Sequence, residues 1–130
     1  MERIFFIIAA GLAFLAVALD AWGAHGLPGG LDAHRLALFE IGVRYQMYHA
    51  LALLGVSFAC TQWPSSWIDA GGWLLISGVL VFSGSLYLLS LTGIKGLGAL
   101  TPLGGLLLLT SWGCLAVGVW RTHSRAGSGR

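Results

Sequence analysis

Residues 4–22 read IFFIIAAGLAFLAVALDAW, and this stretch decides the fold class. It carries no formal charge before Asp20, so it offers the roughly 20 apolar residues that an α-helix needs to cross the hydrocarbon core of a bilayer. A short polar start followed by an apolar run is also typical of a secretory signal peptide. We favour a retained membrane-spanning helix.

The composition of the whole chain supports a membrane protein. Of its 130 residues, 57% are hydrophobic and 9% are charged, and the mean hydropathy is +0.83. Soluble domains carry about 25% charged residues. A soluble core of this size could not hide so much apolar surface, so lipid must cover part of it. The length fits one domain.

Three further apolar segments follow the first. They lie within residues 45–68, within residues 70–94 and at residues 102–120, the last beginning after Thr101 with a proline, which a first helical turn tolerates. The sequence therefore predicts an all-α fold, an integral membrane four-helix bundle. We expect one transmembrane domain over residues 1–121 and a short basic polar tail over residues 122–130.

Two glycine-rich turns set the topology. Residues 23–30 follow the first span and residues 92–98 follow the third, so both turns lie on the same side of the membrane, here called the turn side. The linker at residues 61–66 is short and lacks glycine. This order predicts two helical hairpins.

The second helix is predicted to begin well before its apolar part. Asp32 is a suitable N-cap residue. From there to Gln62 a helix is about 45 Å long, whereas the hydrocarbon core is about 30 Å thick. The first turns of this helix therefore form an interfacial extension.

Charge excludes one class of function and suggests an orientation. The net charge is +2 and the basic residues form no stripe, so we expect no nucleic-acid partner. Basic residues are slightly more numerous on the side of the termini, which predicts that both termini face the cytoplasm. The basic residues on the side of the termini are Arg3, Arg121, Arg125 and Arg130. Those on the turn side are Arg35, Arg44 and Lys95.

Polar residues that could form a site gather on the turn side. The candidates for ligand or partner binding are Asp20, His25, Glu40, Arg44, Tyr45, Tyr48, His49, Tyr87, Lys95 and Thr101. An ionisable residue within a membrane is costly, and it is therefore a functional hypothesis by default. We assign no catalytic residue, metal ligand or cofactor to the chain, because no recognised motif is present.

Glu40 and Arg44 are four residues apart with the acid first, the favourable order for a helical ion pair. The pair either eases the entry of the long helix into the membrane or lines a polar pocket. Asp20 either caps the following turn or pairs with Arg35 or Arg44, and a carboxylate that handles protons or cations would fit the same position.

His49 is expected to be the deepest titratable group, because it lies inside an apolar run. An interhelical hydrogen bond is the leading interpretation, and contact with a quinone, haem or metal is the alternative. Cys60 and Cys114 are far apart and form no CxxC motif, so both are interpreted as small buried hydrophobic residues.

Four motifs together resemble a known family. They are AWGAHGL at residues 21–27, YQMYHAL at 45–51, SGSLY at 83–87 and TPLGG at 101–105. The chain resembles the YgdD-like family of small bacterial inner-membrane proteins of unknown function, whose eukaryotic relatives are named transmembrane protein 256. The resemblance runs from residue 10 to about residue 120, with Trp22 where phenylalanine is expected. It implies a multi-pass inner-membrane protein, and it implies no reaction.

The leading functional prediction is a non-enzymatic binding or accessory protein. It would engage a partner membrane protein or a lipid-like ligand through the turn side, as part of a larger membrane complex or a homo-oligomer surrounded by membrane lipids. The alternative is a small oligomeric transporter of ions, protons or solutes that uses Asp20, Glu40, Arg44 and His49. An intramembrane enzyme or redox protein built on His49 is the third class.

Overall fold

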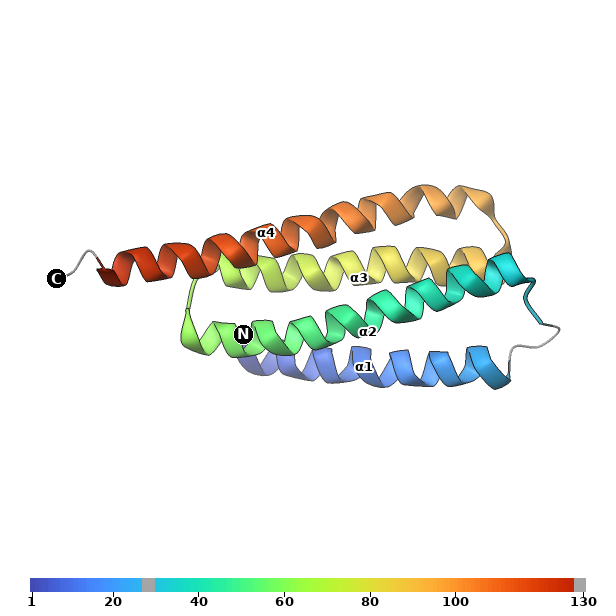
Figure 1. The fold of residues 1–130 in the computed structure, drawn as a ribbon, viewed down its shortest axis with the longest axis horizontal. Coiled ribbons are helices and arrows are strands. Elements are labelled where there is room, and N and C mark those ends of the chain that lie inside the picture. Colours follow the sequence, from blue (N-terminus) through green and yellow to red (C-terminus); the bar gives the residue numbers. More distant parts are fainter. Residues whose placement is uncertain (27–29, 128–130) are drawn as a thin grey trace.

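The computed structural model describes residues 1–26 and 30–127, and in this part the chain forms four α-helices and one 3-10 helix, without strands. The helices lie side by side along the long axis, so α1 begins and α4 ends at the same end of the molecule (Figure 1). The predicted all-α four-helix architecture is confirmed. The elements are α1 (Glu2–His25), α2 (Ala33–Gln62), α3 (Ser66–Thr92), η1 (Lys95–Ala99) and α4 (Leu100–Gly127).

Local sequence signals fix the helix ends. The Asp32 side chain accepts a hydrogen bond from the Arg35 amide at 2.8 Å, so the predicted N-cap of α2 is confirmed. Ser65 caps α3 in the same way through the Trp67 amide. Gly93 ends α3 with a φ of 71°, a left-handed conformation that glycine adopts without steric cost.

Three of the described helical segments are long and apolar enough to cross a membrane, namely Glu2–His25, Ser66–Thr92 and Lys95–Gly127. The fourth expected span, α2, has 30 residues but falls short in apolar character. Polar residues within α2 lower its hydropathy. Two of them, Gln46 and His49, are buried and form hydrogen bonds to neighbouring helices. α2 still runs alongside the other helices (Figure 1).

The helices pack in chain order. α2 packs against α1 and α3, and α3 packs against α4, whereas α1 and α4 occupy the two outer positions and make little contact with each other. The core is aliphatic, with Phe5 from α1 at its termini end. The largest wholly buried side chains include Phe5, Phe39, Leu53, Ile68 and Leu75.

Glycines let the helices approach closely on the turn side, and two examples show how. A methyl group at Gly104 would collide with the main chain of Phe82, so α4 and α3 touch backbone to backbone there. A methyl group at Gly42 would lie 2.7 Å from Cε1 of Tyr87. Small residues at such contacts are typical of membrane helix pairs.

Side-chain hydrogen bonds join each helix to the one before it. All buried side-chain nitrogen and oxygen atoms in the described ranges have a partner. Arg35 on α2 donates forward, to the Ser90 carbonyl of α3, but in four bonds a polar side chain donates to a main-chain carbonyl of the preceding helix. The bonds are Ser57 Oγ to Glu2 O (2.7 Å), Gln46 Nε2 to Leu12 O (2.8 Å), Ser83 Oγ to Gly42 O (2.7 Å) and Ser111 Oγ to Gly71 O (2.7 Å).

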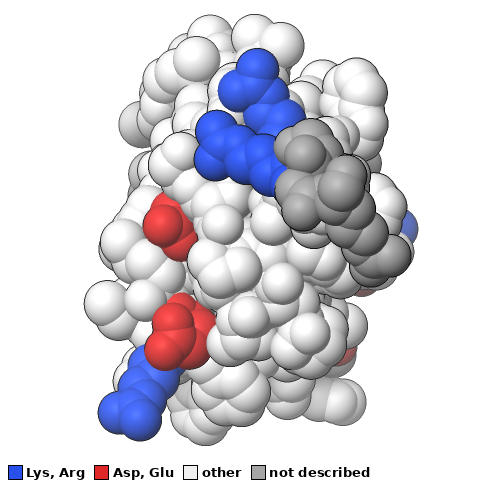
Figure 2. All heavy atoms as spheres, turned by 90° about the vertical axis from the view of Figure 1, so that its left-hand side faces the viewer, with Lys and Arg blue, Asp and Glu red and all other residues white. Residues whose placement is uncertain are grey.

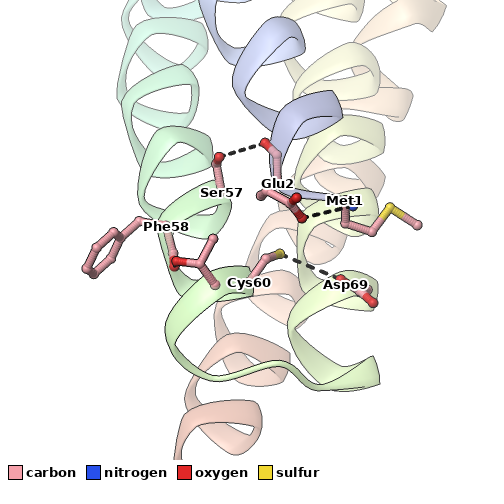
Figure 3. Close-up of polar contacts among 7 residues, drawn as sticks. Met1, Glu2, Ser57, Phe58, Cys60 and Asp69 are labelled. Atoms are coloured by element: carbon pink, nitrogen blue, oxygen red, sulfur yellow. Dashed lines mark hydrogen bonds and ion pairs between the residues drawn. The ribbon is translucent and has the colours of Figure 1, made fainter.

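The termini end carries a small polar cluster. Figure 3 shows Ser57 bound to the carbonyl of Glu2 and the terminal amine paired with the Glu2 carboxylate at 3.3 Å. Cys60 Sγ donates to Asp69 Oδ1 at 3.6 Å. Cys60 and Cys114 are half-buried free thiols, in keeping with their interpretation as small packed residues.

α4 extends beyond its predicted apolar span. Residues 122–127 of the predicted tail are its last helical turns, and residues 128–130 lie outside the described part, as do residues 27–29 of the first glycine-rich turn. Arg121 lies over the ring of Trp67 at 5.4 Å. Figure 2 shows basic side chains together near the top of this end and a further basic group at its lower left, with acidic groups between them.

Candidate functional site

The first candidate site is a cleft between α1 and α2 on the turn side, here called the charged cleft. It encloses about 420 Å³. It brings together four of the predicted site residues, Asp20 from α1 and Glu40, Arg44 and Tyr48 from α2. Its remaining walls are Ala16, Val17, Val43 and Met47.

The expected ion pair within this cleft does not form. Within the described residues Glu40 pairs with neither Arg44 nor any other base, whereas the terminal amine pairs with Glu2 at 3.3 Å. Asp20 likewise pairs with neither Arg35 nor Arg44, and Arg35 instead donates to the Ser90 carbonyl at 2.6 Å. Exposed ion pairs gain little free energy, because two long side chains must be held in one geometry.

The second candidate site is a groove on the other face of α2, here called the aromatic groove. It encloses about 640 Å³ and its lining is mostly apolar. Tyr45 and Phe82 pack at its wall with ring centroids 4.6 Å apart. The lining residues are Tyr45, His49, Phe82, Pro102, Gly105, Leu106, Leu108, Leu109 and Trp112, from α2, α3 and α4.

His49 is held in this groove by both ring nitrogens. Trp112 Nε1 donates to His49 Nε2 at 3.3 Å, so the predicted interhelical hydrogen bond is confirmed. Since Nε2 accepts, Nδ1 carries the proton and donates to the Tyr45 carbonyl at 2.8 Å. His49 is 8% exposed. In this tautomer neither nitrogen is available to a metal or a proton relay.

The structure separates His49 from the three charged residues grouped with it. Glu40 and His49 are nine residues apart on α2, about half a turn around a helix of 3.6 residues per turn. Glu40 therefore lines the charged cleft and His49 the aromatic groove. Asp20, Glu40 and Arg44 form one site, and His49 belongs to another.

Two predicted site residues belong to the framework of the bundle. The Tyr87 hydroxyl donates to Gln46 Oε1 at 2.7 Å, and Thr101 shares a 2.6 Å hydrogen bond with Ser85. Sequence reasoning gave Gln46 no role, although it links Tyr87 on α3 to Leu12 on α1. The available signal was an uncharged polar residue three positions before His49, on the buried face of α2.

The two remaining candidates lie apart at the loops. His25 lines a small pocket of about 270 Å³ beside Gly23 and Leu36. Lys95 lines another, of about 380 Å³, beside Asp32 and Arg35. The charged cleft and the aromatic groove thus gather six of the ten candidates. His25 and Lys95 belong to neither site.

The two sites offer different chemistry. The charged cleft offers carboxylates, a guanidinium and a phenol above apolar walls, and the aromatic groove offers rings and aliphatic side chains. Within residues 1–26 and 30–127 no three His, Cys, Asp or Glu side chains are grouped as a metal site.

Comparisons with known proteins identify the family. The family model described as "Protein of unknown function (DUF423)" matches residues 19–105. The chain is 46% identical to the "UPF0382 membrane protein YwdK" of Bacillus subtilis over 85% of this chain and 90% of that protein. It is 44% identical to the "UPF0382 membrane protein SAB0533" of Staphylococcus aureus over 92% of this chain and 97% of that protein.

A further relative is the "UPF0382 membrane protein SSP2132" of Staphylococcus saprophyticus, 43% identical over 92% of this chain and 98% of that protein. No solved structure matches the chain significantly. The expected kinship with an uncharacterised family of small membrane proteins is therefore confirmed. The chain belongs to the DUF423 family of membrane proteins.

Proposed function

We propose that the protein binds a lipid-like ligand through its turn side and catalyses no reaction on it. The observation that carries this proposal is the aromatic groove of about 640 Å³, whose walls come from α2, α3 and α4. A concave, mostly apolar site with a few polar groups is the usual form of a small-molecule site.

The surroundings of the aromatic groove favour an acyl chain that enters from the bilayer. Leu106 and Leu109 at its rim are 61% and 70% exposed and belong to a segment apolar enough to span a membrane. The Tyr45 hydroxyl makes no hydrogen bond within the described ranges. It is therefore available to a polar group of the ligand.

Photo-crosslinking tests the proposal. The protein in nanodiscs is exposed to a phospholipid with a diazirine in its acyl chain, and mass spectrometry maps the labelled peptides. We expect labelling to concentrate on residues of the aromatic groove. Labelling spread evenly over the lipid-facing sides of α1 and α4 would contradict the proposal.

Two glycines of α4 provide a matched pair of variants. Gly105 lines the aromatic groove, and a methyl group there would have its nearest neighbour at 4.0 Å, so Gly105→Leu fills the groove without a main-chain collision. Gly113→Leu places the same side chain where nothing lies within 4 Å and outside the groove. We expect the first variant to lose groove labelling and the second to retain it.

A partner membrane protein is the competing occupant of the turn side, in an accessory role. Native mass spectrometry after gentle extraction separates the two cases. A retained phospholipid supports the lipid-binding proposal, and a stoichiometric protein partner with no lipid supports the accessory role.

A transporter is the second candidate function, and the charged cleft is the observation that favours it. Asp20, Glu40 and Arg44 line one cleft and would form the ion or proton relay. His49 would take no part in it, because it is bonded to Trp112 in the aromatic groove. Proton or cation flux into liposomes that Asp20→Asn and Glu40→Gln abolish would favour this function. No flux with the unmodified protein would dismiss it.

We further propose that the protein lies in the bacterial inner membrane with both termini in the cytoplasm, as the YgdD-like resemblance and the arginines near the termini suggest. A single cysteine introduced at Arg125, in a variant without Cys60 and Cys114, tests this orientation. Labelling by an impermeant maleimide only after the cells are opened is the expected result.

A further inference from the structure

The charged cleft holds charged groups that have no partner among the described residues. Asp20, Glu40 and Arg44 are exposed, line one cleft of about 420 Å³, and make no ion pair or hydrogen bond within the described ranges. Two carboxylates and one guanidinium leave the cleft with one net negative charge. Such a set suits a ligand that carries both signs of charge.

The charged cleft lies at the level of the lipid headgroups. Asp20 lies 18 residues after the start of α1 at Glu2, and Arg44 lies 18 residues before the end of α2 at Gln62. Each is therefore about 27 Å from the termini end of its helix, close to the roughly 30 Å thickness of the hydrocarbon core. Charges at this boundary are costly unless they are solvated or paired.

Polarity changes along the cleft in the order found along a phospholipid. Glu40 lies one helical turn nearer the N-terminal end of α2 than Arg44. Met47 lies about one helical turn further into the bundle than Arg44. On α1, Asp20 lies above Val17 and Ala16. The cleft therefore runs from the Glu40 carboxylate, through Asp20 and Arg44 at one level, to apolar walls.

We propose that the charged cleft binds a zwitterionic phospholipid headgroup with a primary ammonium, the phosphoethanolamine type. Arg44 binds the phosphate, because the planar guanidinium matches a phosphate with paired hydrogen bonds. Asp20 and Glu40 accept from the ammonium, which has three donors. The upper acyl chain lies against Val17, Val43 and their neighbours, in a site distinct from the aromatic groove.

The same geometry discriminates against other common headgroups. A phosphocholine group keeps the positive charge but has no N–H to donate to Asp20 and Glu40. A phosphoglycerol group has no cation, so the two carboxylates face a net negative ligand. Selectivity therefore depends on the ammonium hydrogens, and each N-methyl group should weaken binding.

A lipid-retention series tests the proposal. The full chain in mild detergent is mixed with equimolar dioleoyl lipids bearing phosphoethanolamine, its monomethyl and dimethyl derivatives, phosphocholine or phosphoglycerol, and native mass spectrometry measures the retained lipid. Affinity should fall stepwise along the methyl series. Because a hydrogen bond to a charged group is among the stronger ones, we expect a total loss of about tenfold or more.

Charge-matched variants locate the site. Asp20→Asn and Glu40→Gln should each weaken retention of the phosphoethanolamine lipid about tenfold. Glu2→Gln, which removes one carboxylate at the opposite end, should leave it unchanged. Arg44→Gln should weaken retention of all phospholipids, and Arg3→Gln is its control. Unchanged size-exclusion and circular dichroism profiles show that each variant folds.

Several outcomes would overturn the assignment. Equal retention of all five lipids excludes selectivity for the ammonium, and equal losses in Asp20→Asn and Glu2→Gln exclude this cleft. If soluble phosphoethanolamine competes as well as the lipid at equal concentration, the ligand is a free metabolite and the lipid source is wrong. Gly105→Leu should leave retention here intact, so failure of the aromatic-groove proposal would remain distinguishable.

Discussion

Gln46 should stabilise the bundle more than any other polar side chain on the turn side. It donates to the Leu12 carbonyl at 2.8 Å and accepts from the Tyr87 hydroxyl at 2.7 Å, and it is 4% exposed. One amide thus joins α1, α2 and α3. Replacing it by leucine removes both bonds and leaves the Tyr87 hydroxyl with Ser83 as its remaining polar side-chain neighbour.

The cost can be worked out from these contacts. A side-chain hydrogen bond between membrane helices contributes about 0.6 kcal/mol on average and up to about 1.7 kcal/mol. Tyr87→Phe removes one such bond, so we expect a loss near 1 kcal/mol. Gln46→Leu removes two and leaves the Tyr87 hydroxyl with Ser83 as its remaining side-chain neighbour, which adds up to about 1 kcal/mol. In the double variant that last penalty disappears, so its cost should fall short of the sum by about 1 kcal/mol or more.

Reversible unfolding by SDS in mixed micelles, followed by tryptophan fluorescence, measures these free energies. Tyr48→Phe is the matched control, because the Tyr48 hydroxyl lies exposed at the charged cleft and makes no hydrogen bond within residues 1–26 and 30–127. Its effect should stay within about 0.5 kcal/mol. Costs of Gln46→Leu and Tyr87→Phe that add within about 0.5 kcal/mol would refute the reasoning, because residues in one network do not act independently.

Three further outcomes can be measured in the same unfolding assay. Gly104→Ala should destabilise by about 1–3 kcal/mol, because the added methyl group meets the main chain of α3, whereas Gly105→Ala, with 4.0 Å of clearance, should change stability by less than about 1 kcal/mol. Trp112→Phe removes the hydrogen bond to His49 and should lower the free energy of unfolding by about 0.6 kcal/mol. Trp120 is 72% exposed, so Trp120→Phe should change this free energy very little. Asp32→Ala should cost about 1 kcal/mol through loss of the cap, and Asp32→Asn should restore most of it.

Much of the architecture could be predicted from the sequence because it depends on local signals. Apolar length predicted the helices, and the side-chain chemistry of Asp32 predicted where α2 begins. The grouping of Glu40 and Arg44 also followed from spacing, since residues four apart share one helix face. The same spacing suggested an ion pair that the structure does not form, because spacing places two side chains near each other without fixing their rotamers.

What the sequence could not predict depends on contacts between helices. The acceptors of Gln46, Ser83 and Ser111 are main-chain carbonyls, which every residue has, so no pattern marks them. The position of His49 beside Trp112, on the side of α2 away from the charged cleft, depends on which neighbour each face of α2 meets. Periodicity defines a face, and only packing decides what lies against it.

The hydrogen bonds between consecutive helices have a consequence for the order in which the protein can assemble. Ser57 and Gln46 on α2 donate to α1, Ser83 on α3 donates to α2, and Ser111 on α4 donates to α3. A ribosome delivers these helices to the membrane in that same order. Each new helix therefore arrives carrying donors for a carbonyl already in place. Arg35, which donates forward to the Ser90 carbonyl on α3, is an exception, since its acceptor is synthesised later.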